Sequence, residues 1–550
     1  MTTVPKRSFA TTPFLVGALL LLCALTFYYF AVLKIDYHKT VLLDLRPYPD
    51  ATEYFAQAKA LLKDGWPSIK IGYDKLPSRY PFGYPILMVP WLKILPEADS
   101  VLAPFRTNQT LGLLLLLGVF GFYTYLAMPL TGGFAALLLA TLPGFFTFCR
   151  SSLSEISASA FCVLAFMFAY LGLAGKRRWK IYLSAVFLGL SVNIRMQSLF
   201  FAPLLLAMVL LPMEGVRLRW FLHCAAVPIA FALAASPVLV LNTIQFHSPL
   251  KTGYDFWVPY WSEKHLLFTL QYIPSDAATL WREFALRPNG YFAANIFGTG
   301  TSFVAAFVIL LGAGFFFIRL SRFVGCAFLA GLSFLAAAVC YKFGADGRLY
   351  LSVLVLLVAV AALPVTWAAK NLFVRKRTIA ASAIFGLFAA ACLGYPSRSG
   401  YNAAVIDRSQ AWDALHFIHP RRQSTRFIAQ KHFVELCGGQ PGIVFSDIDP
   451  VYLNTLLPDS FVAAPLDGKH NYRFSKIWRY GPSEARALIE TGLASSLPVY
   501  ALFVPAHDMK PYFARLPAVP RHQWTILNNS DPEALILKLA PIASEEAAPL

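Results

Sequence analysis

The sequence has 550 residues, of which 57% are hydrophobic, 15% are aromatic and only 14% are charged. A soluble domain carries roughly 25% charged residues, so this balance argues against a soluble globular protein and indicates lipid as the solvent for much of the chain. The formal net charge of +18 does not indicate a nucleic-acid partner, because the basic residues fall in short clusters between apolar runs. The eight cysteines form no readable disulfide or metal-binding framework.

The first apolar run, residues 13–33, is too long for the core of a signal peptide and has no small-residue cleavage site, so we expect a retained first span. A bilayer core about 30 Å thick needs about 20 apolar residues per helix, and helices satisfy their own backbone hydrogen bonds there. The fifth and sixth runs are short and could also form one broken or tilted hairpin. The sequence predicts about eleven spans, at residues 13–33, 109–128, 132–148, 156–173, 181–192, 197–212, 220–241, 302–318, 323–340, 349–369 and 378–394.

The positive charges predict the sidedness of these spans, because Lys and Arg near span ends stay on the cytoplasmic side. With a cytoplasmic N-terminus, every strongly basic short loop falls inside. Three stretches then lie outside: a loop at about 34–108, a second at about 242–301, and the tail after Leu393. We therefore expect a multi-pass protein of a bacterial inner (plasma) membrane.

The tail differs in composition from the rest of the chain. It is polar and contains short β-like runs and helix-like stretches, and about 150 residues are enough to bury a core. The sequence thus predicts an all-α polytopic membrane domain over residues 1–394 and an extracytoplasmic α/β domain over residues 395–550. The β-like runs lie at residues 442–446, 499–504 and 535–539, and the helix-like stretches at about 410–419, 425–436 and 483–490.

The first outer loop begins with an amphipathic helix from Asp50 that stops before Gly65 and suits the membrane surface. Asp50 and Glu53 are three residues apart, so both carboxylates could face one site. On spacing alone the commoner arrangement is a capping box, with Asp50 as N-cap and Glu53 at the third helical position. The following run, residues 79–92, is too short to span and is interrupted by prolines, which indicates an interfacial or re-entrant segment. Its Tyr84 suits the headgroup level.

Taken in order, several segments resemble the GT-C superfamily of membrane glycosyltransferases, specifically the protein O-mannosyltransferase and aminoarabinose-transferase-like group. The resemblance covers about residues 13–370. It rests on the order and spacing of these segments, because no single segment is specific to the family. In that group the paired acidic residues are often adjacent, whereas Asp50 and Glu53 are separated. The similar segments are the acidic start of the first outer loop, the Arg-Tyr-Pro segment at 79–85, the Arg and Glu at 149–155, the basic loop and Gly-rich helix at 175–195, the Ser-Pro-x-x-Thr-Gly-Tyr stretch at 246–254, and the late Arg-Leu-Tyr element at 347–350.

The resemblance implies an inverting transfer of a sugar from a polyprenyl-phosphate carrier to an acceptor on the extracytoplasmic face. Asp50 is then the expected general base, with Glu53 as its alternative and Glu155 as a second carboxylate that positions the acceptor or a metal. The acceptor, whether protein, lipid or glycan, is not specified. The residues expected to bind the lipid phosphate are Arg348, Arg79, Arg150, Arg195, Tyr84 and Tyr350.

Each of these residues could instead have a purely structural role. Arg79 and Arg150 could simply extend to the interface, as arginines at helix ends often do. Glu155 adjoins an apolar run and needs a wet cavity or a cation, which Arg150 could supply. Arg348 could pair with Asp346. His247 and His265 have no close ligand cluster, so no cofactor is assigned, although carboxylates could hold a divalent cation.

Other membrane functions remain as alternatives to a glycosyltransferase. A transporter or flippase also has many spans and intramembrane charges, but usually shows two related halves, and we find no internal repeat. A polysaccharide polymerase or ligase shares the lipid-linked substrate but usually lacks the early acidic loop. A scaffold does not need acidic and basic residues at the outer ends of its spans. The sequence therefore favours the glycosyltransferase.

Overall fold

The structure is a computed structural model, and part of the chain lies outside the residues that it describes. The expected spans at 302–318 and 378–394, the helix at 410–419 and Asp346 fall outside, as does most of the span at 349–369. The described residues are 11–39, 43, 45, 49–210, 217–284, 322–342, 344, 347–353, 355–356, 358, 362–363, 425–466, 470, 472–504, 514–528 and 534–542.

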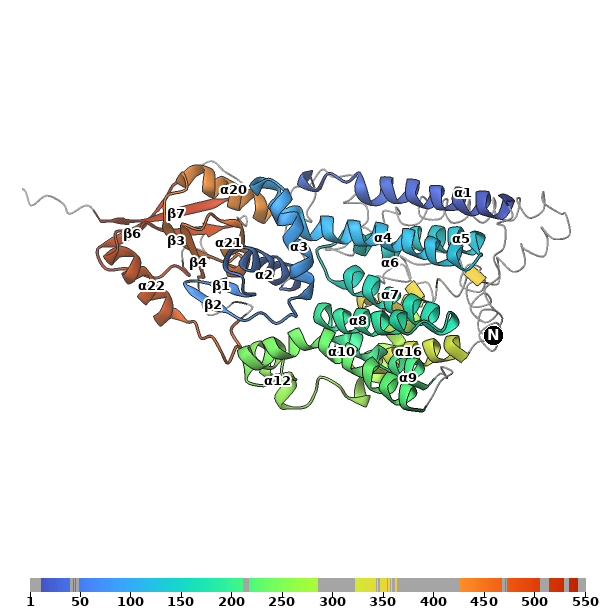
Figure 1. Ribbon diagram of the computed structural model, residues 1–550. Coiled ribbons are helices and arrows are strands. Elements are labelled where there is room, and N and C mark those ends of the chain that lie inside the picture. Colours follow the sequence, from blue (N-terminus) through green and yellow to red (C-terminus); the bar gives the residue numbers. More distant parts are fainter. Residues whose placement is uncertain are drawn as a thin grey trace, which may run out of the picture.

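Long apolar helices run side by side through most of the molecule (Figure 1). α1 packs on α5, α5 on α4, α4 on α7, α7 on α8, and α8 on α10. Within the described part of the chain, three helical stretches are long and apolar enough to cross a membrane: Thr12–Leu33, Glu155–Ala174 and Phe221–Phe246. The helices of this layer are α1 (Thr11–Tyr28, extended by the π-helical η1, Tyr29–Leu33), α4 (Ala103–Tyr125), α5 (Pro129–Ala140), α7 (Glu155–Ala174), α8 (Arg178–Ile194), α10 (Arg217–Phe246) and α16 (Arg322–Val339).

Two expected spans are interrupted in the structure. The run at 132–148 forms α5 and a separate short helix, α6 (Pro143–Cys149), because proline removes a backbone donor and clashes with the preceding turn. The run at 197–212 becomes the 3₁₀ turn η5 (Met196–Phe201) and α9 (Pro203–Leu210). Arg195 is extended (φ −145°, ψ 118°), so the chain breaks between α8 and η5. The total of about eleven spans stays a prediction.

The stretch at about 34–108, predicted as the first outer loop and named so below, contains the expected amphipathic helix. α2 (Asp50–Asp64) ends at Gly65, whose φ of +69° is the left-handed conformation that favours glycine. The capping-box interpretation was wrong: Pro49 is the N-cap, and no side chain makes a capping hydrogen bond. The remaining elements of the two outer loops and their surroundings are η2 (Tyr37–Lys39), β1 (Ile69–Ile71), β2 (Asp74–Leu76), α3 (Gly83–Ile94), η4 (Glu97–Leu102), α11 (Gly253–Trp257), α12 (Pro259–Glu263), η6 (Leu270–Tyr272), α13 (Ile273–Phe284) and η7 (Gly347–Tyr350).

The tail contains a five-stranded sheet in the order β4-β3-β5-β7-β6. The first three strands in this order are parallel, and β7 runs antiparallel to both β5 and β6. Every residue of β3, β4 and β5 is buried, as is usual for parallel strands covered on both faces. The elements are α20 (Thr425–Cys437), β3 (Gly442–Ser446), α21 (Pro450–Leu456), β4 (Phe461–Pro465), α22 (Pro482–Ala494), β5 (Val499–Phe503), β6 (His522–Ile526) and β7 (Leu535–Pro541).

The sheet region packs directly on the first outer loop. The β1–β2 hairpin lies beside α21 (Figure 1), and the Gly72 amide donates to the Ala463 carbonyl of β4 over 2.9 Å. One hydrophobic cluster contains residues from both outer loops and the tail, namely Ala56, Ile69, Ile71, Trp257, Val451, Tyr472 and Trp478. The first outer loop is therefore held between the membrane helices and the sheet.

Candidate active site

A cavity of about 670 Å³ opens where α2, the start of α7, the end of α8 and the second outer loop meet. Its wall contains both charged and apolar side chains. The charged residues include Asp50, Glu155, Arg195 and Arg348, which we call the cavity cluster. The apolar residues include Phe200, Leu241, Phe246, Leu250 and Phe268. A ligand with a charged group and a hydrocarbon chain matches this composition.

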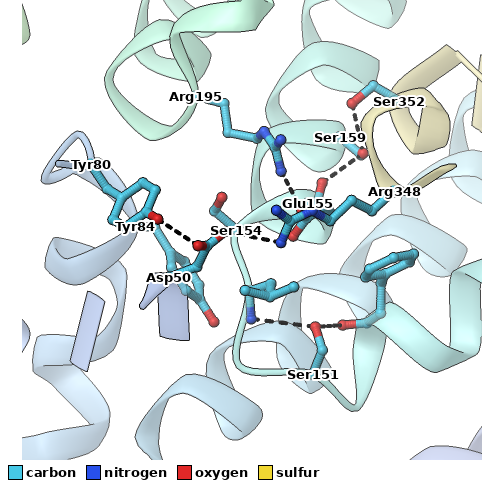
Figure 2. A network of polar contacts seen from close by, with 12 residues as sticks. Asp50, Tyr80, Tyr84, Ser151, Ser154, Glu155, Ser159, Arg195, Arg348 and Ser352 are labelled. Atoms are coloured by element: carbon cyan, nitrogen blue, oxygen red, sulfur yellow. Dashed lines mark hydrogen bonds and ion pairs between the residues drawn. The ribbon is translucent and has the colours of Figure 1, made fainter. Parts of the chain in front are cut away.

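Asp50 is the first residue of α2, and its side chain points toward Arg348 (Figure 2). One carboxylate oxygen, Oδ2, lies 2.9 Å from Arg348 Nη1. The other, Oδ1, accepts a hydrogen bond of 2.5 Å from the Tyr80 hydroxyl. The carboxylate is 15% exposed, so it is held firmly but can be reached from the cavity.

Glu155 is the first residue of α7 and is 3% exposed. Its Oε1 lies 2.5 Å from Arg195 Nη1 and 3.8 Å from Arg348 Nε. Figure 2 shows the two guanidinium groups converging on this carboxylate. Arg348 thus lies between the two acidic side chains. Arg195 and Arg348 are therefore the cations that neutralise Glu155. Arg348 is paired with Asp50 and Glu155, whereas a structural pairing with Asp346 was the alternative considered from the sequence.

The loop before Glu155 is fixed by Asn108 of α4, a fully buried residue that the sequence analysis did not single out. Its amide donates to the carbonyls of Ser151 and Leu153 over 2.9 and 2.6 Å. It also contacts the hydroxyl of Tyr84 at 3.0 Å. The signal that could have found it is a polar amide at the start of an apolar span, where an unpartnered polar group is costly.

Glu53 and Arg79 form a further ion pair next to the cavity, which we call the buried pair. Their side chains are 0% and 7% exposed, and Arg79 Nε lies 3.3 Å from Glu53 Oε1. The other oxygen, Oε2, accepts from the Ser78 hydroxyl at 2.7 Å and from the Arg79 backbone amide at 2.9 Å. Burial raises the pKa of Glu53, and the guanidinium of Arg79 opposes that shift. Arg79 also borders the cavity.

Three of the expected phosphate-binding residues lie away from the described cavity wall. Arg150 is 1% exposed, donates from Nη1 to the Ala31 carbonyl over 3.1 Å and lies over the Phe146 ring. The Tyr350 hydroxyl donates to the Gly344 carbonyl over 2.8 Å, and the Tyr84 hydroxyl donates to the Pro104 carbonyl. A direct contact of these three residues with a lipid phosphate stays a prediction.

Tyrosine rings surround Asp50 in a way that the sequence did not indicate. Tyr80 packs against Tyr54 with ring centroids 4.9 Å apart, and against Tyr254 of α11 at 5.6 Å. All three border the cavity beside the carboxylate. Aromatic faces with hydroxyl groups can pack on a sugar ring and hydrogen-bond to it.

No group of three potential metal ligands occurs among the described residues. His247 and His265 both have positive φ angles, 55° and 53°, and neither borders the cavity. A divalent cation held by carboxylates therefore stays a prediction.

We compared the sequence and the structure with those of known proteins. No family model matches the sequence, and no curated protein matches it. Among solved structures, ArnT from Cupriavidus metallidurans bound to undecaprenyl phosphate is similar, with a TM-score of 0.57 and 12% identity over 97% of this chain and 99% of that chain. The apo state of ArnT gives a TM-score of 0.58 and 12% identity, covering 95% of this chain and 97% of that chain.

The Archaeoglobus fulgidus oligosaccharyltransferase tethered with an acceptor peptide is similar as well, with a TM-score of 0.53 and 14% identity over 92% of this chain and 70% of that chain. These neighbours belong to the GT-C superfamily of glycosyltransferases. The resemblance found in the sequence is thereby confirmed at the level of the fold. The chain has the GT-C membrane fold that these proteins share.

Proposed function

We propose that the protein is a membrane glycosyltransferase that moves a sugar from a polyprenyl-phosphate carrier to an acceptor on the extracytoplasmic face. The observation that carries the proposal is the cavity cluster. Two carboxylates and two guanidinium groups, from four segments far apart in the sequence, meet at a cavity that apolar side chains also line. Transfer from such a donor requires a base, cations for the leaving phosphate and room for a lipid chain.

Asp50 is the proposed general base. Its carboxylate accepts the proton of the acceptor while the acceptor oxygen attacks the anomeric carbon. The bond between that carbon and the phosphate oxygen breaks, and the polyprenyl phosphate leaves with the electron pair. A single displacement of this kind inverts the anomeric configuration. Tyr80 supports the step because its hydroxyl hydrogen-bonds Oδ1 and fixes the carboxylate.

Arg348 and Arg195 are proposed to bind the phosphate. Guanidinium groups bind phosphate oxygens in a bidentate way, and stabilisation of the developing charge lowers the barrier. Arg348 contacts both carboxylates, so a phosphate that draws it away from Asp50 leaves Oδ2 free to accept a proton. Donor binding then prepares the base. Glu155 holds Arg195 in place and lies near enough to orient the acceptor.

The lipid carrier and the membrane orientation belong to the same proposal. Undecaprenyl phosphate is bound in the ArnT neighbour, and the apolar residues that line the present cavity suit such a chain. A bacterial inner membrane, a cytoplasmic N-terminus and a periplasmic domain from about residue 395 are consistent with the basic loops. The sugar and the acceptor are not assigned.

The test is an assay of the full-length protein in lipid nanodiscs with polyprenyl-phosphate sugars that carry a hexose, a pentose or an aminopentose. The reaction is followed through release of polyprenyl phosphate in the presence of bacterial envelope extract as acceptor source. We expect release with at least one donor, and its loss in Asp50→Asn. Asp64→Asn, at the other end of α2 and paired with Lys75, is the matched control and should stay active. No release from any donor by the wild type contradicts the proposal.

A further inference from the structure

Three segments far apart in the sequence meet at the side chain of Arg79. Glu53 of α2 supplies the carboxylate of the buried pair. Trp257, at the end of α11, lies with its ring 5.8 Å from the guanidinium, and Tyr472 of the tail lies at 4.8 Å. The two rings also contact each other edge to face, 5.0 Å between centroids, and both residues are fully buried. The guanidinium is therefore enclosed by one carboxylate and two aromatic faces.

This enclosure bears directly on the proposed base. Glu53 follows Asp50 by three residues on α2, and residues three apart lie on the same side of a helix. On the other segment, Tyr80 is the residue directly after Arg79. The buried pair thus joins two segments at positions adjacent to Asp50 and Tyr80, whose side chains form the 2.5 Å hydrogen bond. A shift of Arg79 would change the distance between that hydroxyl and the carboxylate.

The backbone next to Arg79 is also held from the second outer loop. A Cβ atom on Gly253 would lie 2.3 Å from the Ser78 carbonyl oxygen and 2.4 Å from the Arg79 Cα, so only glycine permits this approach. The Trp257 indole donates to the Pro77 carbonyl over 2.8 Å. With the backbone fixed on this side, the ring of Tyr472 is a contact through which the tail can act on the guanidinium.

We infer that Tyr472 is a positioning residue for the transfer reaction: through Arg79 and Glu53, the tail sets the orientation of Asp50. The inference rests on the proposed function, because it concerns the same base. Tyr472 does not border the cavity and touches neither Arg195 nor Arg348 in the described contacts. Its effect should therefore fall on the rate of the chemical step and leave donor affinity unchanged.

The experiment compares Tyr472→Ala, Tyr472→Phe and Tyr480→Ala in the full-length protein in nanodiscs. Tyr480 is the control: it lies in the same part of the tail, and its ring stacks on Trp478. For Tyr472→Ala we expect kcat to fall about 10- to 100-fold, since small misplacements of catalytic groups cost that much. The KM for the donor should stay within about twofold, because the interactions that bind the donor remain. Tyr472→Phe keeps the ring and should restore most of kcat.

A second measurement does not depend on activity. Amide hydrogen exchange is followed in peptides that cover residues 50–58 and 77–81. Exchange there should become faster in Tyr472→Ala and stay at the wild-type rate in Tyr480→Ala, because local opening follows the loss of the contacts that hold a segment.

The outcomes separate this inference from the proposed function. A wild-type kcat in Tyr472→Ala, an equal loss in Tyr480→Ala, or a loss confined to donor KM would each overturn the positioning role. If the wild type transfers no sugar from any donor, the proposed function fails and hydrogen exchange alone decides. In that case, exchange that is faster in Tyr472→Ala but not in Tyr480→Ala supports the coupling of the tail to α2. Unchanged exchange in Tyr472→Ala refutes the coupling.

Discussion

The cavity cluster and the buried pair use the same chemistry in two different settings. Each joins a carboxylate of α2 to an arginine from elsewhere in the chain. In the cavity cluster Asp50 and Arg348 are 15% and 21% exposed, whereas Glu53 and Arg79 are 0% and 7% exposed. A partly exposed pair can exchange its partner for a ligand, but a sealed pair cannot without leaving a charge unpaired. Exposure therefore separates a pair suited to chemistry from one suited to holding shape.

The strongest test of this comparison is Asp50→Asn. An amide keeps the shape of the side chain but cannot accept the proton, so we expect kcat to fall about a thousandfold, within the range known for loss of a general base. Binding of the lipid phosphate, measured with polyprenyl phosphate alone, should change by less than about threefold. Full activity in this variant would remove Asp50 from the mechanism.

Arg348→Lys should give the next largest effect. Lysine keeps the charge but lacks the planar fork that binds two phosphate oxygens at once. A charge-assisted hydrogen bond contributes about 1.5–3 kcal/mol, so we expect the donor KM to rise about 10- to 100-fold. Donor titrations check this. An unchanged KM together with a lower kcat would mean that Arg348 acts on Asp50 and not on the phosphate.

Glu53→Gln should separate stability from activity. Because the folded-state pKa of Glu53 lies above its usual 4.5, the folded protein binds this proton more tightly than the unfolded chain does. The contribution to stability is then fully present below pH 4.5 and is lost as pH rises through the folded pKa. Glutamine resembles the protonated acid, so the variant should gain stability relative to wild type as pH rises from 4.5 to 7.

The measurement for this prediction is the unfolding temperature of both proteins across that pH range. The unfolding temperature of the variant relative to that of the wild type should rise between pH 4.5 and pH 7, while its kcat falls about tenfold because the buried pair no longer holds the loop. A difference in unfolding temperature that shrinks with rising pH would show that the pair stabilises the fold when ionised.

The smallest effect is expected for Lys63→Ala. Lys63 pairs with Asp459 and so also links α2 to the sheet region, but the two side chains are 61% and 72% exposed. Exposed pairs contribute about 0–1 kcal/mol, so the unfolding temperature should fall only slightly and kcat should not change. A large loss of activity would contradict the view that exposure decides which contacts matter.

Much of the fold could be predicted because it follows from local patterns. Apolar length predicted the helices that became α1, α7 and α10, and helical spacing predicted α2. In the tail, apolar runs predicted β3, β5 and β7. The strand β4 was missed, since its Val-Ala-Ala-Pro sequence has weak β propensity. Its burial comes from neighbours that are distant in the sequence.

The site was harder to predict because its contacts join distant segments. Asp50, Glu155, Arg195 and Arg348 could be named as candidates, yet their pairing could not be read from spacing. The residues around them were missed for the same reason: Asn108, Tyr254 and Tyr472 each act through partners more than 20 residues away. The capping-box interpretation failed because local spacing cannot show that a carboxylate is already bound by a distant arginine.

The position of the first outer loop also bears on how the protein is made. Lys59 donates to the carbonyl of Thr455, 396 positions later, and the Trp478 indole donates to Asp74, 404 positions earlier. Chains emerge from the ribosome with their N-terminal part first, so α2 is synthesised long before its partners exist. The first outer loop can therefore reach its packed form only after the tail residues through Trp478 have been synthesised. Under the proposed function, a shorter nascent chain would not consume the lipid-linked sugar.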